Sequence, residues 1–270
     1  MLVCTLGDLV LDVIVRLRQP LARGGDARSE ITIGGGGQAA NVAAWAAALG
    51  ARARLLGKRA DDDAGRLATA HLAGHGVDVV GPVVSARHSG VIVSLVEPGG
   101  ERTMCPDRGV AVELAPDEID PSWLQGCDWL HISGYALFVE PARSAALRAA
   151  DVARSAGVRV SVDLASWSGI RDVGVDPFRG DLVALGPDVV FANTDEDRTV
   201  GGRLAGPVWI VKRGADGCSF DGDDRPALPV TDVVDTTGAG DALAAGWLVG
   251  GPELALEAAA RCVQRAGSMP

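Results

Sequence analysis

The chain has 270 residues, of which 47% are hydrophobic and 22% charged, a composition typical of a globular protein with a large core rather than a disordered one. Its formal net charge of −10 argues against a surface that binds nucleic acid or an anionic membrane. No apolar run approaches the ~20 residues of a membrane span, and the N-terminus has no basic segment or cleavage site, so we expect a cytoplasmic protein.

Cysteines and histidines show neither a disulfide nor a metal-binding pattern. No two of the five cysteines have CxxC spacing, so we expect buried free thiols rather than a disulfide framework or a zinc site. His71 and His75 share one face of a predicted helix, but the HExxH pattern of a zinc protease is absent.

Two segments at the N-terminus predict strands. Residues 2–6 form a short apolar run that ends at Gly7-Asp8, which is typical of a buried strand. Residues 10–17 alternate in hydrophobicity, which predicts a strand with one covered face. Asp12 lies on this second strand, where a binding role and a solvated surface position are both open.

A glycine-rich segment, residues 33–37, leads into a predicted helix over 42–49. Glycine-rich loops before helices can hold phosphate, but this one lacks the GxxxxGK[ST] pattern. It also lies too far from the first strand for a dinucleotide-binding unit. Asn41, at the start of the helix, is placed to bind a small polar ligand.

A strand over 52–57 and a helix over 61–76 follow, and the helix begins with three aspartates that favour its N-terminus. Residues 90–96 and 101–105 predict a β-hairpin with a turn at 97–100. Together with the alternating strand, these residues predict a small β-unit apart from the helices. Such a unit could be a lid over a site or an oligomer contact.

The second half of the chain alternates between strands and helices, which implies a mostly parallel sheet covered on both faces. The predicted strands are 128–132, 158–162, 188–192, 208–211 and 230–234, and the predicted helices are 141–157, 238–250 and 253–266. Ligands bind beyond the carboxyl ends of such strands. Asp163, Asn193 with Glu196, and residues 214–217 lie at those ends.

The stretch Asp235-Thr236-Thr237-Gly238-Ala239-Gly240-Asp241 carries the most specific chemistry. Glycines let the backbone approach a ligand closely, and the start of a helix offers free N–H groups to an anion. Asp241 could act as a base beside that anion. An anion pocket beside a base indicates phosphoryl transfer to a hydroxyl group.

Four blocks in order resemble the ribokinase-like (pfkB-type) carbohydrate kinases, from the first strand to the last helix. They are Gly7-Asp8 with Asp12, Gly36-Gly37 with Asn41, Asn193-Thr194-Asp195-Glu196, and Asp235 to Asp241. The resemblance implies a single α/β domain over 1–270, a three-layer α/β/α sandwich with a mostly parallel central sheet. A small β-sheet lid would comprise about residues 10–33 and 88–108.

The resemblance also implies ATP-dependent phosphorylation of a primary hydroxyl on a sugar or sugar-like molecule, with Mg²⁺ and, in some members, K⁺. The implied roles are as follows: Asp241 as base; Gly238, Ala239 and Gly240 as anion hole; Asp12, Gly36, Gly37 and Asn41 for the substrate; Asn193, Lys212, Gly214 and Gly217 for the nucleotide; Glu196 for Mg²⁺ through water; and Asp235 with Thr237 for a monovalent cation. A homodimer through the lid is implied as well. Lys212 departs from the family pattern, because many members have Thr there.

Other functions stay open. A nucleoside kinase of the same fold is one alternative, although the predicted lid contains no aromatic residue to hold a base, which favours a plain sugar. A phosphosugar would need basic groups, for which Arg102 and Arg108 are candidates, with surface charge as the other explanation. A non-catalytic sugar- or nucleotide-binding protein and a dinucleotide oxidoreductase are further alternatives, which the intact Asp241 motif and the misplaced glycines disfavour.

Overall fold

The computed structural model describes residues 1–21, 24–99 and 101–270. Within them, a large sheet is built from β1 (Leu2–Leu6), β4 (Arg52–Leu56), β6 (Val77–Val80), β10 (Trp129–Ser133), β11 (Arg159–Asp163), β12 (Val189–Asn193), β13 (Val208–Lys212), β14 (Cys218–Phe220) and β15 (Asp223–Arg225). The strand order is β15-β14-β13-β12-β11-β10-β1-β4-β6. All pairs from β6 to β13 are parallel, whereas β14 and β15 are antiparallel.

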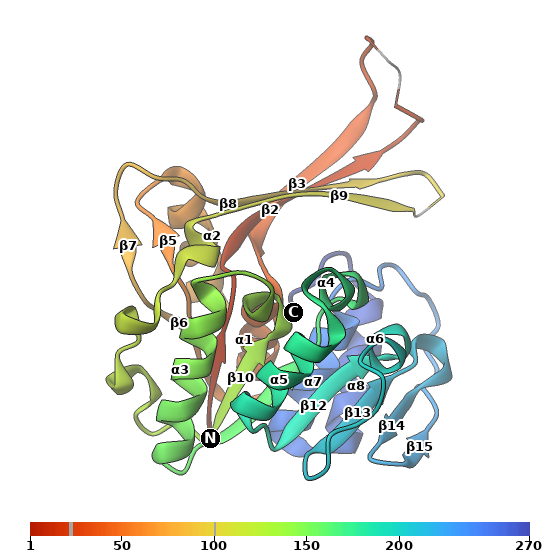
Figure 1. Ribbon diagram of the computed structural model, residues 1–270. Coiled ribbons are helices and arrows are strands. Elements are labelled where there is room, and N and C mark those ends of the chain that lie inside the picture. The colour runs from red at the N-terminus through yellow and green to blue at the C-terminus, as the bar shows by residue number, and fades with distance from the viewer. Residues whose placement is uncertain (22–23, 100) are drawn as a thin grey trace.

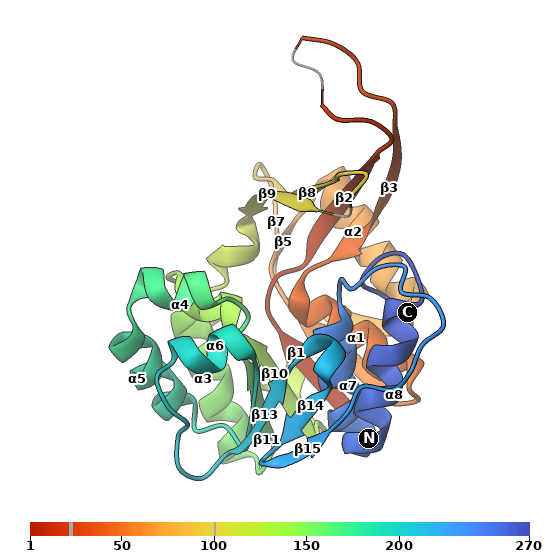
Figure 2. The same cartoon turned by 90° about the vertical axis from the view of Figure 1, so that its right-hand side faces the viewer.

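Helices cover both faces of the large sheet (Figure 2). One layer contains α1 (Gln38–Ala48), α2 (Asp63–Gly74), α7 (Ala239–Gly250) and α8 (Pro252–Val263), and the other contains α3 (Ala142–Ser155), α4 (Trp167–Val173), α5 (Val175–Leu185) and α6 (Thr194–Thr199). Side chains alternate between the two cores, so that Val3 packs under α1 while Leu2, Cys4 and Leu6 pack in the other core. The predicted three-layer sandwich is therefore confirmed.

Short elements connect these layers. They are the strand pair β5 (Arg59–Ala60) and β7 (Val83–Val84), and the 3₁₀ turns η1 (Val110–Glu113), η2 (Pro116–Glu118), η3 (Pro121–Leu124), η4 (Gly134–Phe138) and η5 (Gly214–Asp216). Among the described residues, no helix is long and apolar enough to cross a membrane.

A separate small sheet stands above the carboxyl ends of the large sheet (Figure 1). Its strands are β2 (Val10–Leu17), β3 (Ser29–Gly36), β8 (Ser89–Val96) and β9 (Arg102–Gly109), in the order β3-β2-β8-β9. The register places Asp12, Ile92 and Pro106 in one cross-strand row, and Arg16, Val96 and Arg102 in another. Asp12 and Arg16 are four residues apart on β2, and side chains separated by an even number of residues point to the same side of a strand. Both rows therefore face the body of the molecule.

The sequence predicted strands at the positions of β2, β8 and β9, but it did not predict β3, because residues 33–36 were interpreted as a glycine-rich loop. Residues 22–23, within the predicted lid segment, and Gly100, within the predicted turn, lie outside the described residues. Four cysteines are buried and free as expected, but Cys105 is exposed. The expectation was wrong there because Cys105 lies on the outer face of an edge strand, which no helix covers.

The strand predicted at 230–234 is wrong. These residues belong to a loop between β15 and α7, and β14 and β15 complete the sheet instead. The Val234 N–H donates at 2.8 Å to the carbonyl oxygen of Val263 at the end of α8 rather than to a neighbouring strand. The apolar side chains of Val230 and Val233 line a cavity rather than packing inside a sheet.

Candidate active site

The first turn of α7 is the point where the predicted catalytic motif meets the rest of the chain. Gly238 precedes the helix with φ of 77°, and a Cβ there would lie 2.6 Å from the carbonyl oxygen of Ser268. Only glycine fits both the backbone angle and this close contact. The Ala239 N–H donates to the Thr236 oxygen at 3.3 Å, so one of the three predicted anion-hole amides is already engaged.

A cavity of about 340 Å³ lies between α7 and the small sheet, and we call it the small-sheet cavity. It is lined by Asp8, Asp12, Gly37, Gln38, Asn41, Ile92, Met104, Pro106, Arg108, Tyr135, Ala165, Thr237, Asp241 and Ser268. Gly36 lies directly beside it, because a Cβ there would overlap the Asp12 carboxylate at 2.0 Å. The predicted substrate residues and Asp241 therefore lie around one cavity.

Asp241 forms a short chain of hydrogen bonds inside this cavity. The Asn41 amide Nδ2 donates to Asp241 Oδ2 at 2.7 Å, and the Ser268 hydroxyl donates to Asn41 Oδ1 at 3.0 Å. The serine thereby fixes which end of the amide faces the aspartate. Burial raises the pKa of Asp241 to about 7, although the Asn41 hydrogen bond opposes this shift. The carboxylate can thus gain or lose a proton near neutral pH.

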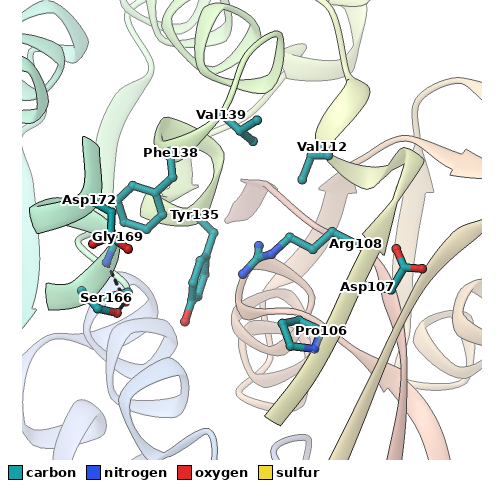
Figure 3. Close-up of a pocket in the computed structure, with 11 residues that line it drawn as sticks. Pro106, Asp107, Arg108, Val112, Tyr135, Phe138, Val139, Ser166, Gly169 and Asp172 are labelled. Carbon is teal, nitrogen blue, oxygen red and sulfur yellow. Dashed lines mark hydrogen bonds between the residues drawn. The ribbon is translucent and has the colours of Figure 1, made fainter. Parts of the chain in front are cut away.

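Two further carboxylates lie in the small-sheet cavity. Burial raises the pKa of Asp12 to about 6. Burial also raises the pKa of Asp8, although an ion pair with Arg108 opposes it. The Arg108 guanidinium lies 4.2 Å from the centre of the Tyr135 ring. Figure 3 shows Arg108 reaching from β9 towards Tyr135.

Arg108 and Tyr135 also line a neighbouring cavity of about 540 Å³, which we call the Tyr135 cavity (Figure 3). Its other walls come from η1, η4 and α4, and they include Val112, Phe138 and Ser166. The two cavities share Pro106, Arg108 and Tyr135. A ligand in the small-sheet cavity can therefore extend past Tyr135 into additional space.

A cavity of about 620 Å³, the α7–α8 cavity, lies on the other side of the α7 first turn. It is lined by Asn193, Lys212, Gly214, Ala215, Gly217, Ala227, Leu228, Pro229, Val230, Val233, Thr236, Ala239, Gly240, Leu243, Leu256, Ala259, Ala260 and Val263. The four residues predicted to bind the nucleotide therefore lie together. The walls between Ala227 and Val233 are apolar and suit a flat ring system.

Asn193 and Glu196 form a compact unit at the start of α6. The Asn193 backbone N–H and its Nδ2 each donate to a different Glu196 oxygen, both at 2.7 Å. Burial and the nearby Asp163 charge raise the pKa of Glu196 to about 7, and Lys212 opposes this shift. Among the described residues, no three His, Cys, Asp or Glu side chains form a metal cage.

Asp235 is a buried carboxylate that accepts hydrogen bonds from both the body and the small sheet. Thr237 donates through N–H at 2.8 Å and through its hydroxyl at 2.6 Å, and the Gly267 N–H donates at 3.1 Å. Arg16 lies 3.2 Å away, and Arg102 contacts the other oxygen. Burial alone would raise the pKa of Asp235, but these donors and the Arg102 charge lower it to about 2.

The comparison with known families decides what this arrangement is. The model of the pfkB family carbohydrate kinases matches residues 1–269. The chain belongs to this family. The carbohydrate kinase predicted from four sequence blocks is confirmed, and so is its class as an ATP-dependent phosphotransferase.

Several relatives of this kinase share most of its length. An ATP-dependent ribose-1-phosphate kinase from Halopiger xanaduensis is 36% identical, over 96% of this chain and 90% of its own. Fructokinase-1 from Oryza sativa subsp. japonica is 32% identical, over 77% of this chain and 70% of its own. The crystal structure of adenosine kinase from Sinorhizobium meliloti, 25% identical, superposes with a TM-score of 0.86 over 99% of this chain and 95% of that one.

The residues of this kinase that line the small-sheet cavity and that the sequence did not predict include Tyr135 and Ser268. Tyr135 lies two residues after the end of β10, so the rule that ligands bind at strand ends could have found it. Ser268 lies in the short segment after α8, which carries no pattern, and only its contact with Asn41 reveals it. Asp235 and Thr237 lie together as predicted, but Asp235 lines neither of the two cavities beside α7.

Proposed function

We propose that this kinase transfers the γ-phosphoryl group of ATP from the α7–α8 cavity to a primary hydroxyl of a sugar in the small-sheet cavity. One observation carries the proposal: the first turn of α7 separates the two cavities. Thr236, Ala239 and Gly240 line the first cavity, whereas Thr237 and Asp241 line the second. A phosphoryl group passing between the cavities must cross this turn.

The chemistry follows from this geometry. Asp241 accepts the hydroxyl proton as the acceptor oxygen bonds to phosphorus and the bond to ADP breaks. The amides of Gly238, Ala239 and Gly240 would stabilise the negative charge of the transferred group, for which the Ala239 N–H has to leave the Thr236 oxygen. Asp12, Gly36, Gly37 and Asn41 define the walls that hold the sugar hydroxyls. The small sheet acts as a lid that excludes water.

We propose that Glu196 and Asn193 hold Mg²⁺ mainly through water. Each Glu196 oxygen already accepts one hydrogen bond from Asn193, so few positions are left for direct coordination. Mg²⁺ commonly binds one or two carboxylates and keeps several waters, and this donor set fits that habit. The ion would neutralise the polyphosphate of the nucleotide.

We propose that guanidinium groups replace the monovalent cation at Asp235 and Thr237. Arg16 and Arg102 already supply positive charge to both Asp235 oxygens. Bound K⁺ would have to displace one of these groups. We expect equal turnover in NaCl and KCl at the same ionic strength. A rate several-fold higher in KCl would contradict this proposal.

The acceptor can be narrowed by what lines the cavity. Arg108 is the basic residue in its described lining, which favours a sugar phosphate such as the ribose 1-phosphate in the name of the 36% identical relative. A nucleoside is the second candidate. Tyr135 supplies an aromatic face beside the 540 Å³ Tyr135 cavity, which weakens the sequence argument against a base.

A homodimer through the small sheet and a cytoplasmic location complete the proposal. Ile31 and Ile33 on β3 are 57% and 60% exposed, and Val13 and Val93 on the same outer face are partly exposed. Burying such a face against a second copy removes apolar surface from water.

The use of ATP and the free thiols favour the cytoplasm.

The experiment that tests the function is an acceptor panel with ATP and Mg²⁺, including ribose, fructose, ribose 1-phosphate and adenosine. ADP and a phosphorylated product are measured together, so that transfer is separated from hydrolysis. We expect transfer to at least one sugar or sugar phosphate. Stabilisation of the fold by a ligand without any ADP would instead support a non-catalytic binding protein.

A further inference from the structure

Lys212 carries an ammonium group beside the proposed reaction centre, and its side chain is only 14% exposed. It is the last residue of β13, and its Nζ donates to Asp163 Oδ2 at 2.5 Å. β12 lies between β13 and β11 in the sheet, so the side chain crosses the carboxyl end of β12 to reach Asp163. The ammonium therefore lies where the parallel strands end and ligands bind.

The same ammonium group lies against the first turn of α7. A Cβ on Gly240 would be only 3.2 Å from Lys212 Nζ and 3.4 Å from its Cδ. The lack of a side chain at Gly240 leaves room for the lysine. Because the N-terminus of a helix carries positive partial charge, the ammonium and the helix face the same small volume. Both line the α7–α8 cavity.

The ammonium stays charged in this setting. Burial disfavours the charged form, but the Asp163 and Glu196 carboxylates outweigh it and raise the pKa of Lys212 above its ordinary value. Among the described residues, Asp163 is the partner to which Nζ donates. Since an ammonium group has three donors, two are left to contact a ligand.

The choice of lysine is itself informative. Only Lys58 and Lys212 are lysines among the 25 Lys and Arg residues of the sequence. Arginine is the usual basic residue of this chain, but its guanidinium is wide and planar, whereas an ammonium is a compact point charge. The narrow space between Gly240 and Asp163 suits the compact group.

We propose that Lys212 is a catalytic residue, whose ammonium contacts a non-bridging oxygen of the phosphoryl group as it crosses the first turn of α7. This inference rests on the proposed function. The ammonium keeps its proton throughout, while the hydroxyl proton passes to Asp241. A positive charge at this point stabilises the phosphoryl group in the transition state more than it stabilises bound ATP, so it accelerates the transfer.

The test uses Lys212→Met, which keeps the length and removes the charge. Because this change leaves Asp163 buried without its partner, Asp163→Asn with Lys212→Met is prepared as well, and thermal unfolding confirms that each variant is folded. We expect kcat to fall about 10²–10³-fold in both, with KM for ATP changed less than about threefold. Lys58→Met, which breaks the Lys58–Glu118 ion pair, is the matched control and should keep kcat.

A second readout does not depend on the acceptor. Aluminium fluoride bound with Mg²⁺ and ADP imitates the phosphoryl group in the transition state. We therefore expect the Tm of the wild-type protein with this mixture to be well above its Tm with ADP and Mg²⁺ alone. The extra rise should vanish in the double variant, while the shift with ADP and Mg²⁺ persists.

Three results separate the possible failures. A double variant with kcat within threefold of wild type would overturn the inference. A variant with unchanged kcat and a greatly raised KM for ATP would do so too, because Lys212 would then only bind the nucleotide. A wild-type protein that phosphorylates no acceptor would overturn the proposed function, and this inference with it.

Discussion

Asp241 is largely buried and accepts a hydrogen bond from Asn41, and both features determine its chemistry. Replacing it by Asn removes the base but keeps the size and a hydrogen-bonding group. We expect Asp241→Asn to lower kcat by about 10²–10⁴-fold while acceptor binding changes little. Steady-state rates and thermal shifts with the acceptor measure the two effects. Turnover close to wild type would remove Asp241 as the base.

The raised pKa of Asp241 also predicts the pH profile. The base must be ionised to accept a proton, and burial raises its pKa to about 7. We therefore expect kcat/KM to fall about tenfold per pH unit below about pH 7 and to level off above it. Rates measured from pH 5 to pH 9 at constant ionic strength check this. A profile that is flat down to pH 5 would contradict a raised pKa.

The same burial has a cost in stability. With its pKa raised from 3.8 to about 7, the native state binds this proton more tightly than the unfolded chain does. The free energy of unfolding therefore falls as the pH rises from about 4 to 7, and the cost is complete above 7. We expect Asp241→Asn to raise this free energy by about 1–4 kcal/mol at pH 8 and by less at pH 5. Urea unfolding at both pH values measures it, and equal effects at the two pH values would contradict the assignment.

At the scale of elements, the contact between the small sheet and Asp235 joins a proposed lid to the catalytic turn. Arg16 and Arg102 stand in one row of the sheet and bracket the same carboxylate. That carboxylate also accepts two hydrogen bonds from Thr237, one residue before Gly238. Two side chains of the small sheet therefore contact the carboxylate that holds the turn before α7.

Replacing both arginines should loosen this closure. We expect Arg16→Gln with Arg102→Gln to raise KM for the acceptor about tenfold, because charge-assisted hydrogen bonds to a buried carboxylate are lost. ATP hydrolysis without transfer should rise as water enters. Arg18→Gln, which removes an exposed ion pair with Glu30 at the end of the same strand, is the control. Unchanged KM and hydrolysis in the double variant would exclude the closure role.

The comparison of predicted and observed elements shows where sequence reasoning succeeds. The parallel strands β1, β4, β10, β11, β12 and β13 were predicted because buried strands are apolar runs, which polar residues follow at the carboxyl ends, as at Asp163 and Asn193. The edge strand β6 (Val77–Val80) was not predicted. The segment 230–234 has the same apolar character but lines a cavity. The hydrophobic pattern of a short segment does not distinguish a strand in a sheet from the wall of a cavity. The two differ only in which other segments of the chain lie beside them.

The candidate site shows the same limit. The motifs predicted Asp241, Asn41 and Lys212, because glycine-rich turns and strand ends leave local signals. Ser268 lies near no motif, and its role in orienting Asn41 depends on a hydrogen bond between residues that are 227 positions apart in the sequence. Such contacts arise from the packing of helices and cannot be found in a single segment.

At the scale of the whole molecule, the proposed homodimer would form through the outer face of the small sheet. We expect Val13→Glu with Val93→Glu to convert a dimer into monomers, because two charges would be buried in an apolar contact. Light scattering after size exclusion measures the mass. Val183→Glu, at an exposed position on α5, is the control and should leave the mass unchanged. A monomeric wild-type protein would refute the dimer.

The hydrogen bonds around Asp241 join parts of the chain that are made at very different times. Asn41 is 200 residues away from Asp241 in sequence, and Ser268 is 227 residues away from Asn41. On a ribosome, the sugar-binding walls emerge early, the base much later, and the serine that orients Asn41 after both. A growing chain therefore carries parts of the cavity long before it can complete it.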